Sequence, residues 1–202
     1  GSTTRRILLT FMLEYVLFSP SNLWLGRAIY NVMLKAKLMF YFSDELKTKK
    51  PKAYPFPCRL SSSLAEIGIR QIDKLAENIK HRSEIVEYLE SKLQWNSSHL
   101  EKTKTSVFLR YSFLVDDRKT FESLFRNHFD LGIWFTSVVQ GRDLELDLVG
   151  YQSGSCPVAE QVVHQIVNFP THSRIPLNTL KKELEKNWIW LENHIVRDNK
   201  IG

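Results

Sequence analysis

Apolar and polar positions recur along the chain with different periods, and these periods predict its elements. From residue 62 to 94, apolar side chains return every three or four positions, interrupted only at Arg82, which predicts one long amphipathic helix. Ser63 and Glu66 have the spacing of a capping box at its start. Between residues 107 and 115, apolar and polar positions alternate, which is typical of a strand with one buried face.

Further segments complete the predicted fold. Strands are expected over residues 131–136 and 143–148, and a short strand or turn over 168–172. Helices are expected after Asp116-Asp117, from Pro157 to about Val167, and from Pro176 onwards, because Asp caps helices and Pro fits a first turn. The sequence therefore predicts an α+β fold: a small, mostly antiparallel sheet covered by helices, with a long connecting helix and an N-terminal apolar helical hairpin.

The most apolar part of the chain lies at its beginning. Residues 7–18 and about 23–40 predict two apolar helices, which form a helical hairpin within residues 3–46. The first run is shorter than the about 20 apolar residues that span a bilayer. Two interpretations stay open for the contact made by residues 5–40. The hairpin packs on another domain or subunit, or it lies on a membrane surface with Arg27, Lys35 and Lys37 facing anionic headgroups.

A linker separates the hairpin from the main fold. Residues 47–58 contain four lysines and three prolines, which exclude a helix and predict an extended segment. Residues 59–202 are the predicted main domain, and residues 1–2 (Gly-Ser) are interpreted as an expression scar. Because the chain does not begin with Met, we expect it to be part of a longer protein.

Composition and charge narrow the class of protein. Apolar residues make up 43% and charged residues 25% of the 202 residues, as in a globular domain that folds without a disulfide or metal. The net charge of +6 comes from the first 60 residues, so the main domain is neutral and we expect no nucleic-acid partner. Cys58 and Cys156 are interpreted as unpaired thiols, which favours a reducing cytoplasm.

The residues alone indicate no catalytic centre. We find no phosphate-binding glycine loop, no nucleophile elbow and no zinc-type Cys/His spacing. Asp143, Glu145 and Asp147 alternate on one face of a predicted strand and could do acid–base chemistry or hold a divalent ion. A solvated acidic face is the favoured interpretation, and no metal site is predicted.

Two stretches resemble a known family. Residues 59–75 (RLSSSLAEIGIRQIDKL) are similar to the signature RMS-x-x-x-A-x-x-G-x-x-Q-L-x-x-L of the DegT/DnrJ/StrS sugar aminotransferases, and residues 79–85 fit its continuation I-x-x-R-R-x-I. Residues 154–161 (GSCPVAEQ) and 167–172 (VNFPTH) resemble the family's later segment P-V-A-E … V-x-x-L-P-x-H. The resemblance covers about residues 57–195, and the hairpin is similar to an insertion in some members from polysaccharide clusters.

The resemblance implies a fold-type-I pyridoxal-phosphate enzyme that acts as a homodimer. Such enzymes transfer an amino group from glutamate or glutamine to a keto-sugar nucleotide, in nucleotide-sugar or surface-polysaccharide biosynthesis. A lysine in the context S-x-x-x-x-K holds the cofactor, and an Asp binds its pyridine ring; both belong to a large N-terminal domain. This chain has neither in that context, which implies that it is the C-terminal small domain. It would shape the active-site cleft and the dimer contact, and be inactive alone without its own cofactor.

Arg59 is the candidate cofactor-binding residue that the resemblance leaves. Many members carry Asn two residues before this arginine, where it reaches the cofactor phosphate of the neighbouring subunit. Here Pro57 stands in that position and has no side-chain donor. Arg59 is then the remaining candidate for a contact with the phosphate, while a buried ion pair or packing at the helix start stay open. The alternative function is a non-catalytic interaction module or a membrane-surface tether.

Overall fold

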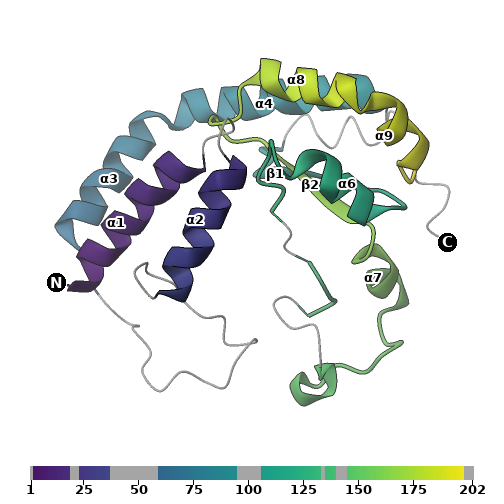
Figure 1. Cartoon of the computed structure of the whole chain (residues 1–202), viewed down its shortest axis with the longest axis horizontal. Coiled ribbons are helices and arrows are strands. Elements are labelled where there is room, and N and C mark those ends of the chain that lie inside the picture. Colours follow the sequence, from purple (N-terminus) through teal and green to yellow (C-terminus); the bar gives the residue numbers. More distant parts are fainter. Residues whose placement is uncertain are drawn as a thin grey trace. The chain divides into compact units, whose positions relative to one another are not determined.

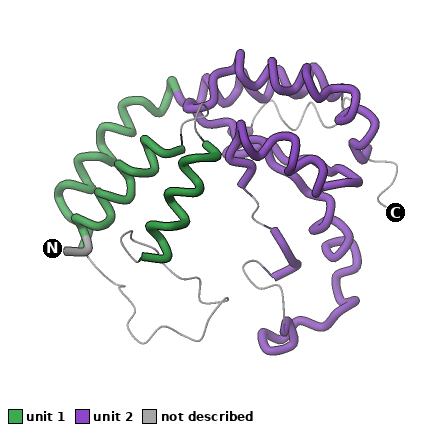
Figure 2. Tube along the Cα trace, in the orientation of Figure 1, with its two compact units in different colours: residues 1–77 green, residues 78–202 purple. Residues whose placement is uncertain are grey.

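The computed structural model describes residues 2–18, 23–36, 59–94, 106–132, 135–139 and 145–197. The chain divides into two compact units, residues 1–77 and 78–202 (Figure 2). The described residues form eight α-helices, one short 3₁₀ helix and one two-stranded antiparallel sheet. The predicted α+β class is confirmed, although helices dominate it.

The helices and strands are labelled in Figure 1. Their bounds are α1 Ser2–Leu17, α2 Leu23–Lys35, α3 Ser62–Asp73, α4 Leu75–Leu93, β1 Arg110–Leu114, α6 Arg118–Phe125, η1 Leu146–Val149, α7 Pro157–Val162, β2 Ile166–Pro170, α8 Leu177–Lys186 and α9 Trp188–His194.

Helices α1 and α2 form the predicted apolar hairpin. They pack side by side, and Gly26 of α2 lies so close to α1 that an added Cβ would stand 1.8 Å from the carbonyl oxygen of Leu17. Tyr30 of α2 donates a hydrogen bond to Glu14 Oε1 of α1, 3.0 Å away. The predicted continuation to residue 40 lies outside the described residues. Among the described helices, none combines the length and apolarity needed to cross a bilayer.

The long predicted helix is two helices. Helix α3 begins after Ser61, whose hydroxyl accepts a hydrogen bond from the Leu64 amide, so the predicted capping box at Ser63 is wrong. Glu66 instead pairs with Arg70 one turn later. At Lys74 the amide bonds to the carbonyl of Gln71, three residues back, which interrupts the α-helical ladder before α4 starts. The prediction of one uninterrupted helix over residues 62–94 is therefore wrong.

The sheet consists of β1 and β2, paired antiparallel. Tyr111 and Phe113 of β1 are buried while Ser112 between them is exposed, as the alternation predicts. Val115 extends the ladder through an isolated bridge to Ile195. The predicted strand or turn at 168–172 is a strand here, and it begins at residue 166. The helix predicted from Pro157 does begin there, but its predicted end at about Val167 is wrong, since α7 ends at Val162 and residues 166–170 pair with β1.

The core of the second unit lies between the sheet and helices α4, α6, α8 and α9. Phe169 of β2 is fully buried, with its ring in contact with those of four other phenylalanines: Phe113, Phe121, Phe125 and Phe129. The predicted C-terminal helix is present but breaks at Asn187, whose amide bonds three residues back to Leu184. Burial of these rings holds a sheet too small to be stable alone.

The described residues of two predicted strands do not form strands. In residues 131–136, the described Leu131, Gly132, Phe135 and Thr136 have no strand pairing. Gly132 adopts a left-handed φ of +54°, which an extended strand does not allow. In residues 143–148, the described part turns into η1, because Glu145 and Gly150 at its two ends are both left-handed. The alternation of apolar and acidic residues there reflects a 3₁₀ turn and not a pleated segment.

Candidate functional site

Arg82 joins the two sequence stretches quoted above. This side chain of α4 donates from Nη1 to the carbonyl oxygens of Leu109 (2.8 Å) and Phe108 (3.2 Å), and the same nitrogen lies 2.8 Å from Thr171 Oγ1. Its Nε donates to Asn78 Oδ1 at 2.7 Å. Arg82 and Thr171 are 89 residues apart in sequence. Residues 79–85, the continuation of the first stretch, are therefore joined to the second stretch by one guanidinium group.

The strand register brings these groups together. Arg110 opens β1 opposite Pro170 at the end of β2, so the next residue, Thr171, leaves the sheet beside the start of β1. Thr171 is fully buried, and its hydroxyl lies 2.7 and 2.9 Å from the carbonyl oxygens of Phe108 and Leu109. Carbonyls that would be orphaned at the end of a sheet are thus satisfied by a threonine and an arginine.

A second arginine, Arg110, is held at the same corner. Its guanidinium donates to the carbonyl oxygen of Asp130 at 2.6 Å and pairs with the Asp130 carboxylate at 3.1 Å. It lies over Gly132, where an added Cβ would stand 2.3 Å from its Cζ. Gly132 is required here both for its left-handed φ and for this close approach.

His172 lies next to these arginines and is kept neutral. Burial, followed by the charges of Arg110, Arg174 and Arg82, lowers the pKa of His172 from 6.5 to about 4, and Asp130 opposes this only weakly. Its Nδ1 is shielded from solvent and has no hydrogen-bond partner among the described residues. The desolvation of Arg82 and the neighbouring charge of Arg110 also lower the pKa of Arg82. We call Arg82, Arg110, Thr171 and His172 the arginine corner.

The side chains of the arginine corner connect segments of the chain to one another. The hydrogen bonds described for Arg82 and Arg110 go to acceptors of this chain, half of them carbonyl oxygens of the backbone and half of them side chains. One residue before Arg82, His81 Nε2 lies 3.0 Å from the carbonyl oxygen of Ile175, which adds another contact between α4 and the segment after β2. The groups of the arginine corner therefore hold α4, the start of β1 and the end of β2 together.

Glu160 of α7 accepts hydrogen bonds from the segment that precedes this helix. Its Oε1 accepts hydrogen bonds from the Tyr151 hydroxyl and the Gly154 amide, both at 2.6 Å. The bond from Tyr151, followed by that from Gly154, lowers the pKa of Glu160, and the same bond raises the pKa of Tyr151. The acidic residue of the P-V-A-E stretch therefore shapes a loop, with Gly154 at a φ of +86°.

An open polar hollow lies beside the start of α6. Asp117 caps this helix through the Thr120 amide at 3.0 Å, and hydrogen bonds from Thr120 lower the pKa of Asp117. Arg118 pairs with Glu122 and donates to the carbonyl oxygens of Phe135 and Val163, so it ties three segments together. The residues that line the hollow are Asp116, Asp117, Arg118, Lys119, Glu122, Thr136 and His164. The predicted cap at Asp116-Asp117 is confirmed in Asp117.

Arg59 lies two residues before the N-cap of α3. It is exposed, and it makes no hydrogen bond or ion pair with the residues that the structure describes. The first amides of α3 and this cation favour a negative charge at the same end of the helix. This position is compatible with a phosphate contact, and it differs from the buried ion pair that was the alternative.

The acidic segment does not form the predicted strand face. Asp143 lies outside the described residues, and Glu145 and Asp147 lie at and within η1. Among the described residues, no cluster of three or more His, Cys, Asp or Glu has metal-binding geometry. Cys156 is an exposed free thiol, and Cys58 lies outside the described part.

The described residues do not fit a complete pyridoxal-phosphate site. Each described lysine is exposed or half-buried on a helix surface, and the half-buried Lys92 and Lys181 lie over the rings of Trp188 and Tyr88. Lys119 does line the polar hollow, but it is exposed there, and three carboxylates line the same hollow: Asp116, Asp117 and Glu122. Among the described residues, Arg59 stays the candidate for a single contact with the cofactor phosphate, and no chemical step is assigned to the cofactor.

The sequence patterns pointed to both stretches and to Arg59 as a candidate, which stays a prediction, and they did not predict the arginine corner. The signal was present, because Arg82 is the one charged residue that interrupts the apolar stripe of the long predicted helix. A cation in a core-facing position needs several acceptors nearby. Which acceptors these are depends on the strand register, which the pattern of residues 107–115 leaves undefined.

Comparison with models of protein families gives a match. The model of the DegT/DnrJ/EryC1/StrS aminotransferase family matches residues 35–185. The curated proteins contain no match to this chain. The matched range includes both stretches and the arginine corner.

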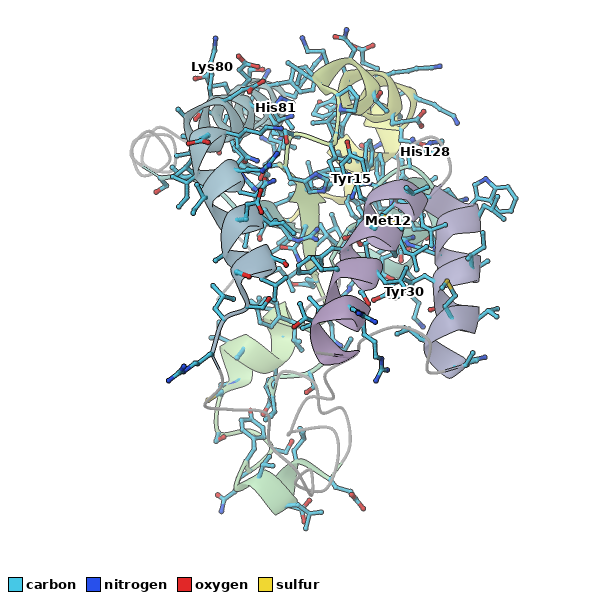
Figure 3. All side chains as sticks on the ribbon, turned by 90° about the vertical axis from the view of Figure 1, so that its left-hand side faces the viewer. Met12, Tyr15, Tyr30, Lys80, His81 and His128 are labelled. Carbon is cyan, nitrogen blue, oxygen red and sulfur yellow. The ribbon has the colours of Figure 1, made fainter. Side chains whose placement is uncertain are left out.

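We expect Arg82→Met to destabilise the second unit by about 3 kcal/mol, because it removes a charged donor that bonds to Asn78, to the backbone before β1 and to the Thr171 hydroxyl. Urea unfolding followed by tryptophan fluorescence measures this. Lys80→Met is the matched control, since Lys80 is exposed on the same helix (Figure 3), and it should change stability by less than about 0.5 kcal/mol. Equal effects of the two substitutions would contradict the role assigned to Arg82.

The depressed pKa of His172 predicts a loss of stability in mild acid. The unfolded chain protonates this imidazole below about pH 6.5, whereas the folded chain resists protonation down to about pH 4. Stability from this group is therefore complete above pH 6.5 and is lost as the pH falls towards 4. Between pH 7 and 5, His172→Gln should lose about 1–2 kcal/mol less free energy of unfolding than the wild type.

The control for this measurement is His164→Gln, at an exposed position of the same unit. It should follow the wild-type curve between pH 7 and 5. A His172→Gln curve that runs parallel to the wild type would show that another group carries the acid sensitivity.

Proposed function

This chain belongs to the DegT/DnrJ/EryC1/StrS aminotransferase family, and we propose that it is the C-terminal small domain of a pyridoxal-phosphate-dependent aminotransferase-like protein. In this proposal residues 59–202 are the small domain, residues 47–58 a linker and residues 3–46 an added hairpin. The observation that carries it is the contact of Arg82 with Thr171, which joins residues 79–85, the continuation of the first family stretch, to residues 167–172 of the second.

The small domain would act by shape and position. Together with a large N-terminal domain that holds the lysine and the pyridine-binding Asp, it would close the cleft over the cofactor and contribute to a homodimer contact. Members of the family in general use pyridoxal phosphate. The proposed reaction transfers an amino group from glutamate or glutamine to a keto-sugar nucleotide, for nucleotide-sugar or surface-polysaccharide biosynthesis. A cytoplasmic location is supported by the free thiol of Cys156.

Arg59 is the residue of this chain that we assign to the cofactor phosphate. It is exposed at the N-terminal end of α3, where its charge and the helix dipole act on the same anion. Pro57 cannot make this contact through a side chain. The assignment makes Arg59 a binding residue and leaves the group-transfer chemistry to the large domain.

Borohydride reduction in the presence of pyridoxal phosphate tests which part of the protein carries the lysine that binds the cofactor covalently. In the full-length protein, one lysine outside residues 1–202 should acquire one pyridoxyl group per subunit, measured by mass spectrometry of peptides. The chain alone should show only sparse labelling spread over its exposed lysines, because none of the described ones is enclosed. Stoichiometric labelling of a single lysine within this chain would overturn the proposal.

A substitution at Arg59 tests the binding role. Arg59→Met in the full-length protein should weaken pyridoxal-phosphate binding about tenfold, because a charge-assisted contact with the phosphate is lost. Equilibrium dialysis with absorbance detection measures the affinity. Arg70→Met, on the same helix and exposed, should bind the cofactor like the wild type. If Arg59→Met also binds like the wild type, Arg59 has no contact with the phosphate.

A further inference from the structure

Helices α1 and α2 expose apolar side chains along their outer faces. The exposed large apolar residues on α1 form one continuous sector of the helix surface, and those on α2 form another. Their exposed fractions range from 39% for Ile29 to 71% for Tyr15. These residues are Leu9, Phe11, Met12, Tyr15 and Val16 on α1 and Trp24, Leu25, Ile29 and Val32 on α2. Figure 3 looks onto α1 and labels Met12 and Tyr15 along it.

The seam between the two helices contains polar and small groups. The hydroxyl of Tyr30 bonds to Glu14 across the seam, and Gly26 lets the two backbones approach each other closely. Thr10 is buried, with its hydroxyl bonded back to the carbonyl of Arg6. A helix pair facing water places apolar side chains inside and polar ones outside. This hairpin leaves many of its large apolar side chains exposed and places Thr10, Glu14 and Gly26 at less exposed positions, beside apolar groups such as buried Leu23 and the ring of Phe18. Helices that pack in lipid also use small residues and side-chain hydrogen bonds at their contacts.

The charges of the hairpin indicate which kind of surface its apolar residues would bind. Its described part carries four basic residues, Arg5, Arg6, Arg27 and Lys35, and one acidic residue, Glu14, which is half-buried at the seam. Basic residues flanking an apolar face complement a surface with anionic headgroups. Trp24 and Tyr15 are strongly exposed, and such amphipathic rings prefer the boundary between headgroups and acyl chains.

We propose that the α1–α2 hairpin binds in the plane of a membrane interface that contains anionic lipid, with its outer apolar residues among the upper acyl chains. With 16 and 13 residues, the two helices are shorter than the about 20 that cross a bilayer, which suits a helix pair that lies on one leaflet. A second copy of this chain would bring its own excess of positive charge to the same face. Charge complementarity therefore favours the lipid surface. This inference does not rest on the aminotransferase assignment, because it uses only the surface of the hairpin.

Vesicle co-sedimentation with the full chain tests the proposal. The probes are vesicles of phosphatidylcholine with 30% phosphatidylglycerol (about a third anionic lipid) and vesicles of phosphatidylcholine alone. The chain should pellet with the anionic vesicles and at least about tenfold less with the neutral ones, and Arg5→Gln with Arg6→Gln should weaken anionic binding about tenfold. Raising the salt to about 1 M should weaken it as well.

A pair of matched double variants separates the hairpin from other exposed apolar positions. Met12→Ser with Val32→Ser changes side chains that are 61% and 66% exposed, and Ile69→Ser with Ile72→Ser on α3 changes side chains that are 62% and 68% exposed. The hairpin variant should lose at least about tenfold in vesicle binding. The α3 variant should bind like the wild type. Circular dichroism of both variants should retain the wild-type helix signal.

Three results would overturn the proposal. The first is a chain that stays in the supernatant with anionic vesicles, and the second is equal loss of binding in the two double variants. The third is self-association without vesicles that the hairpin variant abolishes while vesicle binding is absent, which would identify a second copy of the chain as the occupant. None of these results would change the outcome of the borohydride experiment, so the two proposals fail separately.

Discussion

The second unit depends on the contact between Arg82 and the end of the sheet. A two-stranded sheet cannot bury enough surface to hold itself together, and its last carbonyl groups would be left without partners. The guanidinium of Arg82 and the hydroxyl of Thr171 satisfy the carbonyl oxygens of Phe108 and Leu109, and at the same time they fix α4 to both strands. The phenylalanines around Phe169 can then pack against a sheet whose position relative to α4 is set. Arg82 and Thr171 come from the two stretches that resemble the family, so the contact that stabilises this fold is made by residues of those stretches.

The parts of the fold that follow from local pattern were predicted well. The apolar hairpin, the middle of β1 and the cap at Asp117 each depend on residues close together in sequence. The predicted strand over 143–148 was wrong because alternation does not report the left-handed backbone of Glu145 and Gly150, which turns the chain into η1. The break at Lys74 was missed for a similar reason. No Pro or Gly marks it, and the change is a single hydrogen bond from the four-residue to the three-residue spacing.

The candidate site was predictable only where it coincides with a motif. Arg59 could be named from its place before the helix, and its exposure at the start of α3 could not. The arginine corner needs the register that sets Arg110 opposite Pro170, and a register is a tertiary property that one strand pattern does not contain. The neutral state of His172 is still harder to predict from the sequence, because it results from burial and from three arginines that come from different segments.

Gly132 illustrates how one backbone position constrains a distant one. Its missing side chain provides the space that the guanidinium of Arg110 occupies, and its left-handed φ is one that glycine adopts without strain. A larger residue at position 132 would displace the guanidinium of Arg110. A shorter residue at position 110 would leave a void next to Gly132. These two positions are therefore expected to change together over evolution or to stay fixed together. A homologue with alanine at 132 should have replaced the arginine as well, and should close this corner by a different set of contacts.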